Sequence, residues 1–202
     1  MKNAFTLAEV LVTLGIIGVV AAMTVPNLME NYQRQSYVTQ LRKVYSELSQ
    51  AAETAMTENN VPRLREVKAL RQGARTFLTT YFKTVQTCTS SNLTECLADE
   101  YTTLSGVEFP NTLTSNDACA VLASGSTLCL RKLDSSLIAT VDINGKQPPN
   151  IYGRDLFILS VDSDGSITST VSPDSATLEG CMEGEYGVCF AQILRDGWIM
   201  DY

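Results

Sequence analysis

Glu9 is the first residue whose type and position point to a chemical role. It is the only charged residue in the apolar stretch 5–25, which ends just before Pro26. A helix of this length is about 32 Å long and can cross the hydrocarbon core of a membrane. A carboxylate within such a helix costs about 2.5–3.5 kcal/mol, so it is usually retained for a function. We therefore regard Glu9 as a candidate functional residue.

Six cysteines form the second set of reactive side chains, and all of them follow the apolar stretch. Their number is even, none has the C-x-x-C spacing of zinc or redox sites, and the chain has no histidine to complete a metal site. Short and long gaps alternate between them, which favours pairing across each short gap. The sequence thus predicts three disulfides and an oxidising compartment. The predicted pairs are Cys88–Cys96, Cys119–Cys129 and Cys181–Cys189.

Carboxylates and amides in two turns form the third set. Asp142, Asn144 and Asp155 lie close together in sequence, and a second acidic turn ends at Gly165. Calcium binds six to eight oxygens of this kind, so the first three residues are its candidate ligands. However, Asn-Gly and Asp-Gly are also among the commonest tight-turn pairs. We interpret both segments as turns, and we expect neither a metal ion nor a cofactor.

The absence of histidine narrows the function classes. It removes the usual general base, the catalytic triads that contain histidine and the commonest zinc ligand. The sequence also contains no P-loop, no paired-glycine nucleotide fingerprint and no G-x-S-x-G motif. We therefore expect a protein that is not an enzyme.

Two ordinary explanations of the apolar stretch compete with a special role for it. A secretory signal peptide would use Lys2 as its basic region and would be cleaved after Ala22, which would release a soluble binding module or a hydrolase that uses carboxylates. A plain transmembrane anchor also explains the length of the stretch. Neither explains Glu9, and signal cleavage would discard a helix whose pattern continues beyond residue 25.

The N-terminal part of the chain, to about residue 55, resembles type IV pilins and the pseudopilins of type II secretion. The resemblance rests on a short basic leader, the sequence F-T-L-x-E, two glycines within the apolar stretch and a proline at its end. The family normally has glycine just before the phenylalanine, whereas this chain has alanine, which is nearly as small. The positions that carry the comparison are Lys2, Ala4, Phe5, Glu9, Gly15, Gly18 and Pro26.

This resemblance implies how the chain matures and assembles. A prepilin peptidase is expected to cut between Ala4 and Phe5 and to methylate the new amino group of Phe5. Glu9 is then expected to pair with the Phe5 amine of a neighbouring subunit, because opposite charges in a low-dielectric helix bundle prefer each other to lipid. The helix is expected to be weakest, and to melt partly in filaments, at Gly15, Gly18 and Pro26.

The same resemblance implies partners and location. The precursor is expected to cross the inner membrane once with its head outside the cytoplasm, and then to enter an extracellular or periplasmic filament. The expected partners are the prepilin peptidase, other pilin or pseudopilin subunits, an inner-membrane assembly platform and membrane lipid. The acidic head argues against nucleic-acid binding. A minor pilin that binds a ligand stays an alternative, although Glu9 favours a subunit inside the fibre.

The expected organisation is a leader at 1–4, a helix at 5–58 and a globular head at 59–202. Within the helix, 5–29 is the transmembrane or filament-core part and 30–58 is an amphipathic stem with apolar steps of three and four. The expected fold class is α+β and pilin-like. It combines the long N-terminal helix with a C-terminal antiparallel β-sheet head whose loops are closed by disulfides.

Within the head, we expect a second helix at 63–86 followed by short strands. A hairpin is predicted at 119–131, because two β-rich runs flank a Ser-Gly-Ser turn. The C-terminal segment 181–198 is expected to contain the last cysteine loop and a short strand. Further strands are predicted at 137–143, 156–161 and 167–171.

Charge is unevenly distributed along the chain, whose formal net charge is −7. Residues 30–83 contain nine basic and five acidic residues, whereas residues 85–202 contain five basic and sixteen acidic residues. Two interpretations stay open. The charged side chains simply face solvent, or the acidic head of one subunit meets the basic stem region of another.

Overall fold

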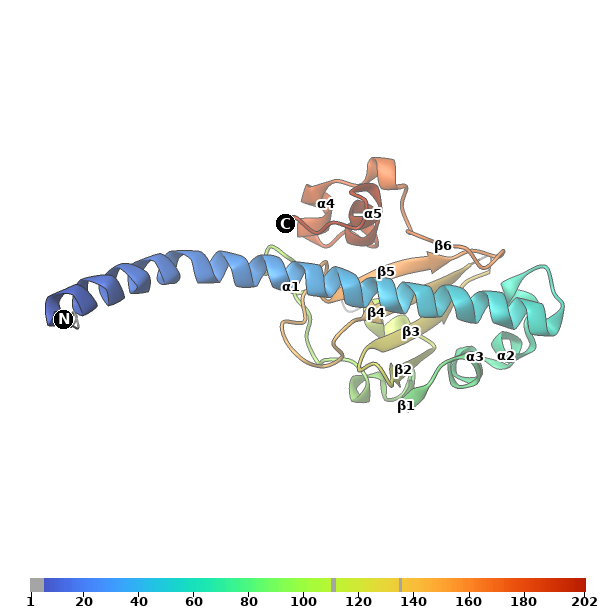
Figure 1. Ribbon diagram of the computed structural model, residues 1–202. Helices are drawn as coiled ribbons and strands as arrows, with labels where there is room; N and C mark the ends of the chain where they lie inside the picture. Colours follow the sequence, from blue (N-terminus) through green and yellow to red (C-terminus); the bar gives the residue numbers. More distant parts are fainter. Residues whose placement is uncertain (1–5, 110–111, 135) are drawn as a thin grey trace. The chain divides into compact units, whose positions relative to one another are not determined.

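The computed structural model describes residues 6–109, 112–134 and 136–202 (Figure 1). The chain divides into two compact units, of which the first ends at Ser36 and the second runs from Tyr37 to Tyr202. One helix, α1 (Leu7–Asn59), contributes to both units. The second unit contains the sheet and all the shorter helices.

The part of α1 in the first unit exposes its apolar side chains. Leu11 is 62% exposed and Ile17 is 63% exposed, although both would normally be buried in a water-soluble protein. By length and composition, this part of α1 is long and apolar enough to cross a membrane, and it is the one such segment in the described part of the chain. Its surface therefore has no covering partner within its own unit.

The part of α1 in the second unit buries one stripe of side chains. The stripe begins at Val38 and continues at steps of three or four residues, which places its members on one helical face. The helix ends at Asn59, one residue beyond the predicted end at residue 58. The core of the second unit thus begins within α1. Its α1 members are Val38, Leu41, Val44, Leu48, Ala51, Ala52 and Ala55.

A six-stranded antiparallel sheet forms the centre of the second unit. The strands pair in sequence order, so each strand lies beside the strands that precede and follow it in the chain. The described residues therefore form an α+β fold with a long N-terminal helix and three disulfides, as predicted. The strands are β1 (Thr84–Thr89), β2 (Ala118–Leu122), β3 (Thr127–Lys132), β4 (Leu137–Asp142), β5 (Leu156–Val161) and β6 (Ile167–Thr168).

Both faces of the sheet are covered by apolar residues. The α1 stripe shares one cluster with side chains of α2 (Lys68–Gln72) and α3 (Ala74–Tyr81), together with Phe190. The other cluster contains all six cysteines and the buried rings of three aromatic residues. Those rings belong to Tyr101, Phe109 and Tyr152.

The predicted helix at 63–86 is wrong in two respects. Gly73 has φ of 140° and ψ of 159°, which lies outside the helical region and separates α2 from α3. The chain then becomes extended at Phe82, and the β-branched residues that follow pair with β2. Short 3₁₀ turns occupy Leu64–Glu66, Leu93–Glu95, Thr112–Ser115 and Pro173–Ser175.

The predicted C-terminal strand is also wrong, because that segment forms two helices. α4 (Leu178–Glu183) begins where the Thr177 hydroxyl accepts a hydrogen bond from the Gly180 amide, and it ends at left-handed Gly184. α5 (Val188–Arg195) buries most of its residues. The predicted strand at 167–171 is shorter than expected, since β6 ends at Thr168.

Candidate functional site

Glu9 and Thr6 form a capping box at the start of α1. The Glu9 carboxylate accepts hydrogen bonds from the Thr6 amide at 2.9 Å and from the Thr6 hydroxyl at 2.8 Å. The Thr6 hydroxyl in turn accepts a 3.2 Å hydrogen bond from the Glu9 amide. This reciprocal arrangement satisfies two backbone donors that a helix N-terminus otherwise leaves unpaired.

The capping box gives Glu9 a local structural role that the sequence analysis did not identify. Its signal is present in the sequence, because Thr6-x-x-Glu9 has the spacing of a capping box. Thr6 and Glu9 are both exposed, so a neighbouring molecule has access to the carboxylate. The arrangement can therefore both cap the helix and present one negative charge on an apolar surface.

Gly15 and Gly18 of the N-terminal motif have no packing partner among the residues that the structure describes. A Cβ added at Gly15 or Gly18 would meet nothing within 4 Å, so no residue in the described part of the chain gives a steric reason for either glycine. Pro26 lies inside α1, where its ring removes one backbone hydrogen-bond donor. Ala4 and Phe5, the predicted cleavage and methylation positions, lie outside the described residues.

The three disulfides join the same cysteines that the spacing favours. Cys88–Cys96 ties β1 to the turn that follows it, Cys119–Cys129 links opposite positions of β2 and β3, and Cys181–Cys189 joins α4 to α5. All six side chains are buried.

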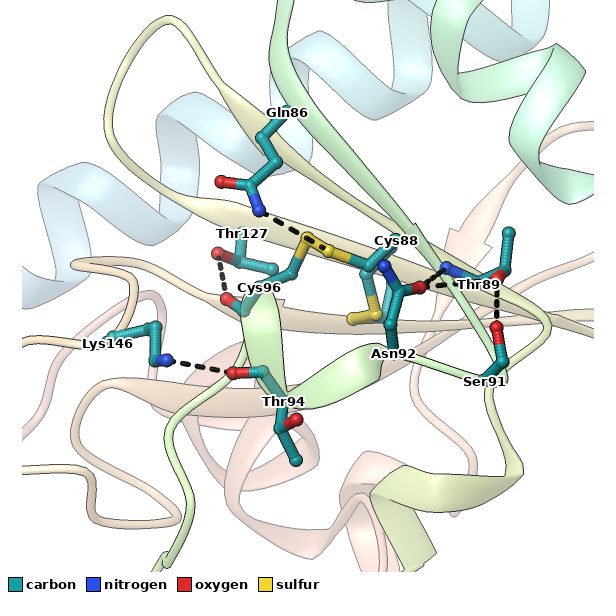
Figure 2. Close-up of a disulfide and its surroundings, with 11 residues drawn as sticks. Gln86, Cys88, Thr89, Ser91, Asn92, Thr94, Cys96, Thr127 and Lys146 are labelled. Atoms are coloured by element: carbon teal, nitrogen blue, oxygen red, sulfur yellow. Dashed lines mark hydrogen bonds between the residues drawn. A yellow bond between two sulfur atoms is a disulfide. The ribbon is translucent and has the colours of Figure 1, made fainter.

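Figure 2 shows how polar contacts hold the Cys88–Cys96 loop. The Asn92 side chain accepts a 2.8 Å hydrogen bond from the Thr89 amide, and the Thr127 hydroxyl donates to the Cys96 carbonyl at 3.0 Å. The Lys146 ammonium donates to the Thr94 carbonyl at 2.8 Å. These contacts anchor the loop to β3 and to the β4–β5 connection, so we assign the loop a structural role.

Two buried carboxylates organise the connection between β4 and β5. Asp142 accepts a 2.5 Å hydrogen bond from the Tyr101 hydroxyl and a 3.3 Å bond from the Asn144 amide. Asp155 accepts from the amides of Asn150 and Ile151 at 2.7 and 2.6 Å. Both aspartates are fully buried. Asp155 therefore satisfies amides of the loop itself, whereas Asp142 accepts from an amide of the loop and from Tyr101 outside it.

Burial shifts the pKa values of Asp142 and Asp155. It raises the pKa of Asp142 to about 7, with a further rise from the Asp155 charge, although hydrogen bonds from Tyr101 and from the backbone oppose the shift. Burial likewise raises the pKa of Asp155, against the Ile151 and Asn150 hydrogen bonds. The pKa of Tyr101 is also raised, first by burial and then by the Asp142 charge.

The three candidate calcium ligands lie in this one loop. The Asn144 side-chain amide donates to the Gln147 and Pro148 carbonyls, so it helps to fold the loop. Among residues 6–109, 112–134 and 136–202, no three histidine, cysteine, aspartate or glutamate side chains gather as a metal-binding group. Tyr101 is the residue of this cluster that sequence reasoning missed, since nothing in the sequence links it to Asp142, which lies 41 positions away.

Comparison with known proteins identifies one family signature. Residues 1–25 match the prokaryotic N-terminal methylation motif. No curated protein and no solved structure matches the chain significantly. The matched segment contains the Thr6–Glu9 box and both glycines of the exposed apolar helix. Residues 1–25 of the chain thus carry the prepilin-type signature found in type IV pilins and pseudopilins.

Proposed function

We propose that the protein is the precursor of a structural subunit of a type IV pilus or of a secretion pseudopilus. In this proposal, a prepilin peptidase cleaves between Ala4 and Phe5 and methylates Phe5. The mature subunit then leaves the inner membrane and joins other subunits in a filament, which an inner-membrane platform assembles. The methylation motif over residues 1–25 supports the proposal, as does the apolar helix that follows the predicted cleavage position.

The observation that carries the proposal is a single negative charge on an exposed apolar helix surface. Lipid or neighbouring helices would cover this surface, and either environment disfavours an unpaired carboxylate. The amine of a neighbouring subunit's Phe5 would supply the missing positive charge. Gly15 and Gly18, which have open space around them, would let neighbouring helices approach closely.

The capping box makes a sharp test of this role possible, because charge and cap can be removed separately. Glu9→Gln removes the charge but keeps an acceptor that a capping box can use. Thr6→Val removes the hydroxyl and leaves the charge. An assembly role for the charge predicts that Glu9→Gln lowers filament yield at least tenfold in a strain without the wild-type gene, whereas Thr6→Val lowers it much less.

Membrane insertion and the folding of the second unit serve as controls, and both should be unchanged in the two variants. If Thr6→Val were the more damaging change, Glu9 would act mainly as a helix cap. Normal filament yield from Glu9→Gln would contradict the proposed pairing with Phe5. The readout is the amount of subunit in sheared filaments relative to the membrane fraction.

A further inference from the structure

Basic side chains gather on the two short helices that follow α1. Lys68 and Arg71 on α2 and Arg75 on α3 are all exposed, and residues 63–75 contain five basic residues but only one acidic residue. None of these three cations forms an ion pair with any residue that the structure describes. Lys68 and Arg71 lie about one helical turn apart, where like charges repel each other. We name Lys68, Arg71 and Arg75 the basic surface.

Acidic side chains gather on a segment that has no basic residue. Neither lysine nor arginine occurs from residue 85 to residue 130. Asp99, Glu100 and Glu108 are exposed and line one hollow. In the described part of the chain, these carboxylates form no ion pair and belong to no group that could hold a metal ion. We name Asp99, Glu100 and Glu108 the acidic surface.

Both surfaces are carried by backbone that is fixed to the core. Leu70 and Phe77 anchor α2 and α3, since they are buried in the cluster that α1 shares. The buried Tyr101 anchors the acidic segment through its hydrogen bond to Asp142, and its carbonyl accepts a 2.8 Å hydrogen bond from the Phe109 amide. A preorganised surface loses little conformational entropy when it binds. Both surfaces are therefore ready to contact a partner without prior rearrangement.

The two surfaces lie on opposite faces of the sheet. In β5, Phe157 and Leu159 belong to the cluster that contains α2 and α3, whereas Ile158 belongs to the cluster that contains Tyr101 and Phe109. Successive side chains of a strand point to opposite faces, so the two clusters cover opposite faces. The basic and acidic surfaces of one copy therefore point away from each other, and they can meet only across two copies.

We propose that the basic surface of one copy contacts the acidic surface of a second copy. A second copy is the favoured partner because every copy carries both charges, and opposite charges orient two molecules as they meet. The contact is made at the outer ends of charged side chains, so no side chain has to enter the interior of the other copy.

Such a contact joins two different surfaces, so it is heterologous. A heterologous contact repeats along a fibre when its rotation does not close a ring. The contact deepens the proposed function and rests on it, because a filament subunit presents both surfaces to its neighbours. It also gives a role to the uneven distribution of charge along the chain, in which the basic residues precede the acidic segment.

Photo-cross-linking in the full-length chain tests this contact. The photoreactive residue p-benzoylphenylalanine replaces Gln72, which is exposed between the cations of the basic surface. Membrane and sheared-filament fractions are separated and then irradiated. The expected product is a covalent dimer in which a peptide from residues 93–109 of the second copy carries the cross-link. Because this segment has no lysine or arginine, a protease that cuts at acidic residues is used to map it.

A matched position controls for random collisions. The same photoreactive residue replaces Val85, which is 74% exposed on β1. It should give no dimer that is linked to residues 93–109. Circular dichroism of each variant checks that the second unit still folds.

A charge exchange tests the pairing of opposite charges. Lys68→Glu with Arg71→Glu should lower the dimer yield from the Gln72 position at least about tenfold, because like charges then face each other. Adding Asp99→Lys with Glu100→Lys should restore most of the yield. Lys43→Glu with Lys83→Glu makes the same change in net charge outside the basic surface and should leave the yield unchanged.

A nucleic acid is the other class of partner that exposed cations could bind. A bridging nucleic acid would bring two basic surfaces together, so the cross-link would join residues 63–75 of both copies. Nuclease treatment before irradiation would then abolish the dimer. Either result would overturn the contact between copies.

The remaining outcomes separate this contact from the proposed function. No dimer in either fraction, or cross-links only outside residues 93–109, would overturn the contact even if filaments form normally. Dimers mapped to the acidic surface in membranes of cells that make no filaments would support the contact and contradict the filament function. Failure of the charge exchange to restore the yield would also overturn the proposed pairing of charges.

Discussion

The two stretches of α1 have the same backbone conformation but opposite surroundings. From residue 7 to residue 36, large apolar side chains such as Leu11 and Ile17 are more than half exposed. From residue 37 to residue 59, apolar side chains such as Leu41 and Leu48 are almost completely buried. Apolar burial contributes roughly 25 cal/mol per Å², so only the second stretch stabilises the fold of its own chain. The exposed apolar surface of the first stretch supports the proposal that a partner outside the chain covers it.

Arg42 in the second stretch and Glu9 in the first differ in a similar way. The Arg42 guanidinium in the second stretch lies 5.1 Å from the centre of the Trp198 ring, and it also donates to the Gly197 carbonyl. It therefore links α1 to the C-terminal segment of the same unit. Glu9 in the first stretch contacts only its own helix start within the described residues. In the proposed function, a positive charge from another molecule neutralises it.

The largest effect should follow from removing the second stretch. A fragment of residues 37–202 should fold as a monomer without free thiols, whereas residues 59–202 should not fold stably. The shorter fragment loses seven buried residues of the core. The free energy that their burial contributes exceeds a typical net stability of about 5–15 kcal/mol. Circular dichroism, cooperative melting and thiol titration test both fragments. A cooperative transition in the shorter fragment would contradict the division at Tyr37.

Single truncations should sharpen the same contrast. Leu48→Ala should lower the free energy of unfolding by about 2–5 kcal/mol, because it leaves a cavity at a side chain that is 1% exposed. Leu11→Ala should leave that free energy unchanged, since Leu11 makes no contribution to the second unit's core. Denaturation of the full chain in detergent measures both values. Equal losses for the two variants would mean that the first stretch also stabilises the fold.

The change of stability with pH that Asp142 causes should be confined to the second unit. The pKa of Asp142 is raised from 3.8 to about 7 by burial, so its protonated form favours the folded state. Asp142 thereby contributes up to about 4 kcal/mol to the free energy of unfolding. This contribution is fully present below about pH 4 and is lost as the pH rises through 7. Asp142→Asn should flatten this part of the pH profile, whereas Glu9→Gln should not. Parallel profiles of wild type and Asp142→Asn would contradict the assignment.

The smallest expected effect is that of calcium. Millimolar calcium should not change the melting temperature of the second unit, because the oxygens of Asp142 and Asp155 already accept hydrogen bonds from the Tyr101 hydroxyl and from amides of the loop. Asp155→Ala should lower stability equally with and without calcium. A rise of several degrees that a chelator reverses, and that both Asp142→Ala and Asp155→Ala abolish, would instead establish a calcium site.

Much of the fold followed from patterns that act over short distances. The stripe from Val38 onward predicted the buried face of α1, and the hairpin at 119–131 was predicted by its turn and its β-rich flanks. The helices α4 and α5 were missed because each is too short to be stable alone. The disulfide between them and the cap at Thr177 stabilise them. Neither feature produces a strong hydrophobic periodicity in the sequence.

The candidate site was predictable only in part for the same reason. Glu9 stands out because it is one charge in an apolar stretch, and its capping partner Thr6 lies at the spacing that local rules describe. The bond between Tyr101 and Asp142 joins residues far apart in sequence, so it depends on how the sheet folds. Local rules therefore reach the capping box but not the buried acid cluster.

The mature N-terminus tests the central claim most directly. The first stretch of α1 is proposed to be retained for assembly, which requires cleavage between Ala4 and Phe5. Mass spectrometry of the protein purified from its native membrane or filament fraction should therefore find N-methylated Phe5 as the first residue. A chain that begins at Met23 would mean that a signal peptidase removes Glu9 and both glycines, and it would contradict the proposed function.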